Sequence, residues 1–318
     1  MNQVASLRRA IQDLELPHSF FDKLHIALML RIEDALDGFA PSVDLLVGPS
    51  RVGKTMLIHS LAREFLEVTK DGFRHVPVLV VPVPTPATPK QLPRSVLKAL
   101  GAPLPTAVTG VAQMFERMAR QLKLAGTRVI LFEEASHIVD VGTKVPPRAA
   151  GDWFKQLTDV LGISVVLFGV PRLTRLLESN EQLRLRSGAV MQFRPYAWTE
   201  HDEMRSFAAC IRAFVGIFEQ WGRTFAIGFD SFVRNCYLLS GGLIGVVSKF
   251  MARLAFDLKA RAPGEISFAD CAHSAALIEA AGDSDHPAFQ ELEVPPIKLH
   301  AAYTFVLNEA GMRHLKTR

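Results

Sequence analysis

The chain contains the stretch Gly48-Pro49-Ser50-Arg51-Val52-Gly53-Lys54-Thr55, which fills the spacing G-x-x-x-x-G-K-[ST] of a phosphate-binding loop. The apolar run 43–47 comes directly before it, and residues 56–66 after it carry apolar side chains at helical spacing. A glycine-rich turn that leads from a strand into a helix presents free backbone N–H groups to an anion. Strand, loop and helix stand in the required order, so we favour a phosphate loop over a chance glycine turn.

Each residue type in this loop has a chemical use. Gly48 and Gly53 let the backbone approach a phosphate without a Cβ in the way, and Lys54 would reach the β- and γ-phosphates. The Thr55 hydroxyl would be a ligand of Mg²⁺. We therefore expect a site for ATP and Mg²⁺ whose nucleotide contacts come from consecutive residues, namely Gly48, Pro49, Ser50, Arg51, Val52, Gly53, Lys54, Thr55 and Met56.

A second stretch, Arg128-Val129-Ile130-Leu131-Phe132-Glu133-Glu134, is an apolar run that ends in two carboxylates. At roughly eighty residues after a phosphate loop, it has the form of a Walker B strand. Alternation along a strand would point Glu133 and Glu134 in opposite directions. Glu133 would hold the metal, in place of the more usual aspartate, and Glu134 would polarise the attacking water.

Composition limits the class of protein. The chain has 318 residues, enough for about two domains, and its 49% apolar and 21% charged residues are typical of globular proteins. A net charge of +4 permits a nucleic-acid partner without requiring one. Its three cysteines, Cys210, Cys236 and Cys271, are too far apart for a zinc motif and are expected to be buried. The sequence shows neither a secretory signal nor a long apolar span, so we expect a cytoplasmic protein without a membrane partner.

We expect an α/β fold on a parallel sheet, followed by helices. The apolar runs 76–83 and 163–171 predict further buried strands, because a parallel sheet is covered on both faces. After residue 197 the strand signals fade and helical patterns dominate. The predicted parts are an N-terminal helical segment 1–40, a nucleotide-binding α/β domain 41–196, a helical lid domain 197–281, and a linker with a C-terminal tail 282–318.

Together these features resemble the AAA+ ATPases, whose fold is a P-loop α/β domain with a C-terminal helical lid. Within that class, several segments in order resemble the TniB/TnsC family of transposition ATPases, over roughly residues 25–260. These segments are Pro77-Val78, Thr88-Pro89-Lys90, Glu133 to Ile138, Trp153 to Leu157, Gly169 with Leu173 and Arg186, Pro195 to Phe207, and Gly241 to Gly245.

The resemblance implies an ATP-dependent, DNA-binding regulator of transposition that assembles on target DNA and recruits or activates a transposase. Its partners would be duplex DNA, a cognate transposase, a target-selection protein of the TniQ type, and further copies of the chain in a ring or helical filament.

The resemblance also implies roles for single residues. The family's catalytic and metal-binding positions fall on Lys54, Thr55, Glu133 and Glu134. The arginine that acts on a neighbouring subunit's nucleotide falls on Arg186, with Arg172, Arg175 and Arg184 as alternatives.

Two positions depart from the family pattern. Glu133 replaces an aspartate, and the strand at 163–171 ends in Gly169-Val170 where a polar sensor of the γ-phosphate is usual. The sensor is then missing unless Ser164 or Thr174 substitutes for it. Both departures concern the rate of hydrolysis more than ATP binding.

In AAA+ assemblies the surface toward the axis comes from segments after the second strand and beside the Walker B strand. Arg94 and Lys98 are four residues apart and share one face of a predicted helix 91–100, while Leu92 and Val96 take another. A plain solvated face is an equal alternative, and no base-reading motif is present, so binding would be largely independent of sequence. The candidate DNA contacts are Lys90, Arg94, Lys98, Arg117, Arg120, Lys144 and Arg148.

Two other functions stay open. One is an AAA+ nucleotide switch that acts on protein partners without DNA; salt-sensitive DNA binding and DNA-stimulated hydrolysis would separate it from the first. The other is a P-loop kinase, which the helical lid and the lack of a further substrate motif disfavour.

Overall fold

The computed structural model describes residues 3–14, 16, 18–70, 72–104, 110–140, 146–282 and 285–312. By their packing, the residues form two compact units. The α/β unit comprises residues 21–48 and 54–193, and the helical unit comprises residues 1–20, 49–53 and 194–318. The middle of the phosphate loop therefore groups with the helical unit, although its two ends belong to the α/β unit.

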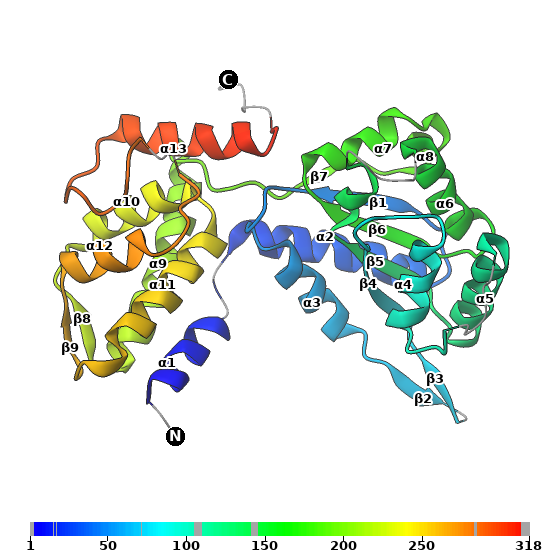
Figure 1. The fold of residues 1–318 in the computed structure, drawn as a ribbon, viewed down its shortest axis with the longest axis horizontal. Coiled ribbons are helices and arrows are strands. Elements are labelled where there is room, and N and C mark those ends of the chain that lie inside the picture. Colours follow the sequence, from blue (N-terminus) through cyan, green and yellow to red (C-terminus); the bar gives the residue numbers. More distant parts are fainter. Residues whose placement is uncertain are drawn as a thin grey trace. The chain divides into compact units, whose positions relative to one another are not determined.

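The α/β unit is built on a five-stranded parallel sheet in the order β4-β5-β6-β1-β7 (Figure 1). Strands that follow one another along the chain, such as β4, β5 and β6, are joined by helical crossovers, as parallel pairing requires. The strands predicted from the apolar runs are confirmed by β1, β4, β5 and β6. β7 was not expected, because two residues are too few to show an alternating pattern. The strands are β1 Val43–Val47, β4 Val78–Pro82, β5 Val129–Glu133, β6 Ser164–Gly169 and β7 Met191–Gln192.

Helices flank this sheet, so its central strands are apolar on both faces. In β1, for example, Leu45 and Leu46 point to opposite faces and both are buried. A two-stranded antiparallel hairpin, β2 Val68–Lys70 with β3 Phe73–His75, was not anticipated from the sequence. The helices are α2 Ser19–Leu36, α3 Lys54–Glu64, α4 Gln91–Ala99, α5 Val111–Leu124, α6 Pro147–Asp159, α7 Arg175–Glu178 and α8 Glu181–Arg186, with 3₁₀ turns η1 Ala135–Ile138 and η2 Pro171–Thr174.

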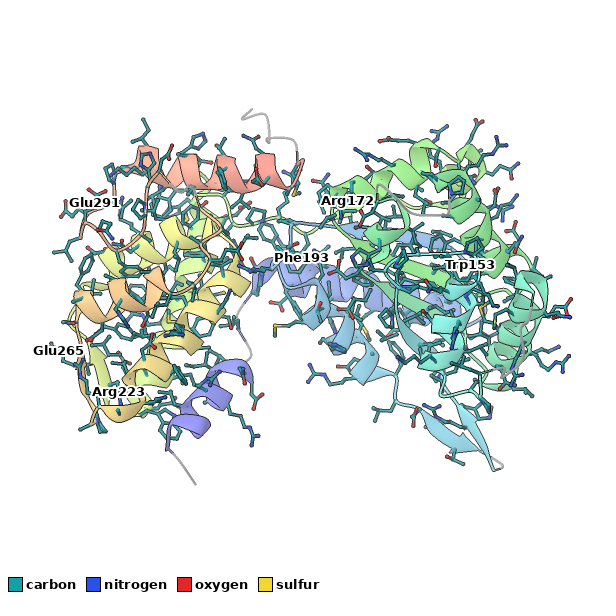
Figure 2. All side chains as sticks on the ribbon, in the orientation of Figure 1. Trp153, Arg172, Phe193, Arg223, Glu265 and Glu291 are labelled. Carbon is teal, nitrogen blue, oxygen red and sulfur yellow. The ribbon has the colours of Figure 1, made fainter. Side chains whose placement is uncertain are left out.

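The helical unit has a small parallel strand pair, β8 with β9, which the sequence did not predict. Figure 2 labels Arg223 on β8 and Glu265 on β9 at this end of the unit. The buried Arg223 guanidinium is satisfied by backbone carbonyls, since its Nη2 donates to Leu258 O at 3.0 Å and to Arg261 O at 2.6 Å. The elements are α1 Gln3–Gln12, α9 His201–Gln220, β8 Arg223–Phe225, α10 Phe229–Ser240, α11 Ile244–Asp257, η3 Leu258–Ala260, β9 Gly264–Ile266, α12 Phe268–Ala276 and α13 Pro296–Glu309.

The three cysteines and the possible membrane spans were both considered from the sequence. Cys210, Cys236 and Cys271 are all buried, as predicted. Within the described part of the chain, no single helix has the length and apolar character needed to cross a membrane. The bent pair formed by 229–240 and 244–260 meets those two criteria only when its halves are counted together.

Candidate nucleotide site

The start of α3 places Lys54 and Thr55 directly after the phosphate loop. The Lys54 side chain is buried, and its Nζ donates to Gly48 O at 2.9 Å across the mouth of the loop. Burial lowers the pKa of Lys54 from 10.5 to about 8, against the opposing effect of the nearby Glu134 carboxylate. A buried ammonium at the mouth of a phosphate loop is suited to bind a phosphate group.

Thr55 and Glu133 come from motifs far apart in the sequence and meet in the fold. The Thr55 hydroxyl donates to Glu133 Oε1 at 2.6 Å, because α3 begins and β5 ends at the same edge of the sheet. A hydroxyl beside a carboxylate is the hard oxygen donor set that Mg²⁺ prefers in nucleotide sites. Glutamate in place of aspartate therefore reaches Thr55 without difficulty.

Glu134 does not continue the strand. β5 ends at Glu133, and Glu134 adopts left-handed backbone angles, φ 54° and ψ 36°, ahead of the turn η1. Its exposed side chain is thus oriented by a turn, and strand alternation does not determine the direction of this residue. Left-handed backbone costs a residue with a Cβ on the order of 1–3 kcal/mol and persists where the surroundings impose it.

The carboxyl end of β6 is completed by Ser136 from η1. Its Oγ accepts a hydrogen bond from Val170 N at 2.6 Å, and a Cβ on Gly169 would lie 2.3 Å from that oxygen. Ser164, by contrast, lies at the other end of β6, where its Oγ accepts from Ser42 N at 3.2 Å. Ser164 therefore cannot substitute for the missing sensor. The hydroxyl at the carboxyl end of the strand is that of Ser136, which was not predicted from the sequence. Gly169, which faces it, was the available signal.

Thr174 was the other possible sensor. Its Oγ1 donates to Pro171 O at 3.0 Å within η2, a local bond that closes the turn. This bond gives the hydroxyl a structural role in the described state.

The arginines near the end of β6 differ in their partners. Arg186 is in an ion pair with Asp159, and Arg172, labelled in Figure 2, pairs with Asp140. Arg184 approaches Glu181 at 3.9 Å on the same helix. Arg175 is exposed, and among the residues that the structure describes it has no carboxylate partner.

The remaining loop residues take up varied environments. Pro49 and Val52 are buried, while Ser50 and Met56 are exposed. Gly53 has φ 116°, and Arg51 has φ 65° although it carries a side chain.

The cationic face predicted on the helix after β4 is present. In α4, Arg94 and Lys98 are exposed on one side, while Leu92 and Val96 are buried on the other. Within the described ranges, neither cation has an ion-pair partner, and the same holds for Lys90 at the N-cap of α4. Of the other candidates, Arg117 Nη2 donates to Pro103 O at 2.7 Å, Arg120 and Arg148 are exposed, and Lys144 lies outside the described residues.

Comparison with known families decides the class of the chain. A family model described as "Bacterial TniB protein" matches residues 29–194, which include the phosphate loop, Glu133, Glu134 and Arg186. The chain belongs to the TniB family. No curated protein matches the TniB chain in sequence.

Solved structures of Orc and Cdc6 proteins have a similar fold. Cdc6p from Pyrobaculum aerophilum aligns with a TM-score of 0.64 at 13% identity, over 94% of this chain and 82% of its own. The Orc1 protein of Aeropyrum pernix in complex with DNA aligns at 0.55 and 16% identity, over 82% of this chain and 65% of its own. The ORC2 protein of Aeropyrum pernix, in ADPNP–ADP complexes, aligns with a TM-score of 0.59 at 13% identity, over 83% of this chain and 69% of its own. The TniB chain thus has the predicted AAA+ fold with a C-terminal helical domain, and it spans about two thirds of the length of the Orc1 chain.

Proposed function

We propose that this TniB chain binds and hydrolyses ATP, assembles on duplex target DNA, and there recruits or activates a transposase. A TniQ-type target-selection protein and further copies of the chain are the other proposed partners, and work on DNA would place the protein in the cytoplasm. Membership of the TniB family supports the link to transposition.

The nucleotide part rests on the residues around the phosphate loop. The buried Lys54 would bind the β- and γ-phosphates, the Thr55–Glu133 pair would hold Mg²⁺, and Glu134 would orient and deprotonate the attacking water. When bound, Mg²⁺ on ATP neutralises charge on the phosphates. The nucleotide contacts remain those proposed for residues 48–56.

One observation carries the DNA part of the proposal: on a face opposite to its buried one, α4 presents cations that have no carboxylate partner among the residues that the structure describes. Exposed and unpaired charges are available to phosphates, because no internal ion pair has to be broken first. We propose Lys90, Arg94 and Lys98 as the principal contacts, with Lys144 and Arg148 as further ones.

The test removes these charges together. We expect the triple variant Lys90→Ala, Arg94→Ala, Lys98→Ala to bind duplex DNA more weakly and to reduce the slope of log affinity against log salt by up to about three. ATP affinity should not change, because none of these residues belongs to the phosphate loop. Fluorescence anisotropy of labelled duplex over a salt series measures the slope.

A second triple variant with the same charge loss serves as the control. Replacing the exposed Arg63, Arg205 and Lys259 by alanine also lowers the net charge from +4 to +1 but leaves α4 intact. Equal effects of the two triple variants would show that overall charge, and not the α4 face, attracts DNA. An absence of DNA binding by the unaltered chain would instead favour the alternative of a nucleotide switch acting on proteins.

We also propose that Arg186 acts on the nucleotide of a neighbouring subunit, after leaving its ion pair with Asp159. Arg186→Ala should then bind ATP normally but lose hydrolysis that depends on assembly, by about a hundredfold or more. Mixing it with Lys54→Ala subunits should restore part of the activity, because each assembly then contains complete sites. Arg184→Ala and Arg175→Ala are the matched variants; if one of them shows the loss and Arg186→Ala does not, the role belongs to that arginine.

A further inference from the structure

Inside the helical unit, three glycines in the turn before α11 and in its first turn lie in close contact with three other segments. A Cβ on Gly241 would come within 2.4 Å of the Val306 side chain, and one on Gly242 within 2.3 Å of Tyr196 O. A Cβ on Gly245 would lie 2.3 Å from Arg51 O, in the phosphate loop. Real Cβ atoms do not approach a carbonyl oxygen so closely, so each position requires glycine for packing.

The contact at Gly245 includes a hydrogen bond. The Gly245 N–H donates to Arg51 O at 3.1 Å. Gly245 is the second residue of α11, where the N–H has no partner inside the helix, and the N-cap residue Leu243 has no side-chain acceptor. The Arg51 carbonyl therefore caps α11.

The capping residue is itself under strain. Arg51 has φ 65°, a conformation that costs a residue with a Cβ about as much as one good hydrogen bond contributes. Two contacts hold its side chain: Nη2 is 2.8 Å from Glu279 Oε2, and Nη1 donates to Glu279 O at 3.3 Å. The next residue is also held, because buried His18 makes a hydrogen bond to the Val52 backbone.

This arrangement sets the direction of the loop's peptide groups. In a trans peptide the C=O and the following N–H point in opposite directions. Anchoring Arg51 O on α11 consequently points the Val52 N–H away from α11, and fixes the chain that enters Gly53 and Lys54. A phosphate loop binds through such oriented N–H groups.

We propose that Gly245 is a positioning residue of the nucleotide site, which lets α11 hold the phosphate loop in its binding conformation, with Glu279 as a weaker support. The inference rests on the proposed binding of ATP. It assigns a role in the nucleotide site to a residue that lies 191 positions after Lys54 and outside the loop's own motif.

The first test is Gly245→Ala with Gly216→Ala as its matched control. Both glycines lie in helices and have no positive φ, so replacing either by alanine raises the helix propensity. A Cβ on Gly216, however, meets nothing within 4 Å. Gly245→Ala must push Arg51 aside by about 1 Å, and we expect it to weaken ATP binding by on the order of tenfold or more. Gly216→Ala should bind like the unaltered chain. Titration with a fluorescent ATP analogue measures affinity, and circular dichroism checks the fold.

A second variant keeps the inference testable if Gly245→Ala fails to fold. The Glu279 side chain is 77% exposed, so Glu279→Gln cannot disturb the core. We expect it to weaken ATP binding about twofold to fivefold at low salt, with the difference fading at high salt as screening weakens the ion pair. Glu265→Gln, another exposed glutamate of the helical unit, should have no effect.

Two outcomes overturn the inference, and they are distinguishable. If the unaltered chain binds ATP and Gly245→Ala and Glu279→Gln bind it equally well, α11 does not position the loop. If the unaltered chain does not bind ATP, the proposed function itself is wrong, and the role of Gly245 falls with it.

Discussion

Lys54→Ala is expected to weaken ATP binding by at least about a hundredfold while the protein stays folded. The change removes a charge-assisted hydrogen bond to the phosphates, worth on the order of 3 kcal/mol, at the centre of the loop. The fold should tolerate the loss because burial already disfavours the ammonium, as the lowered pKa of Lys54, about 8, indicates. Titration with a fluorescent ATP analogue measures binding, and a thermal melt monitors the fold.

Lys123→Ala is the control for this experiment. Lys123 is an exposed lysine in the last turn of α5, so its loss changes the net charge equally without touching the loop. The control should bind ATP like the unaltered chain. Normal ATP binding by Lys54→Ala would mean that residues 48–55 are not a phosphate loop, and the central hypothesis would fail.

Glu134→Gln should slow ATP hydrolysis by about a hundredfold to a thousandfold with ATP affinity nearly unchanged. Glutamine has the same shape and the same cost in the left-handed region, so the turn after β5 should persist. What disappears is the carboxylate that would take a proton from water, and general-base catalysis is worth about this factor. Steady-state phosphate release gives turnover, and analogue titration gives affinity.

Glu116→Gln, an exposed glutamate of α5, is the matched substitution outside the site. It should leave both quantities unchanged. Should Glu134→Gln turn over ATP at the normal rate, the catalytic role would move to Glu133, whose carboxylate then could not serve only to hold Mg²⁺ with Thr55.

The sequence by itself determined the elements that the chain carries as continuous segments. The phosphate loop, the strand ending at Glu133 and the apolar run of β6 were predicted because their residues are neighbours along the chain and specify local geometry. The cationic face of α4 was predicted for the same reason, since helical spacing alone separates Arg94 and Lys98 from the buried side. The short strands β7, β8 and β9 were missed, because two or three residues hold no period.

Only the tertiary structure decided which distant residues meet. It pairs the Ser136 hydroxyl with Gly169 and Val170, engages Arg186 with Asp159, and turns Glu134 out of the strand. It also brings Gly245 against Arg51, so that a helix begun almost two hundred residues later is capped by the phosphate loop. None of these contacts has a local pattern, because each depends on how close two backbones come, and that distance is set by the packing of whole elements.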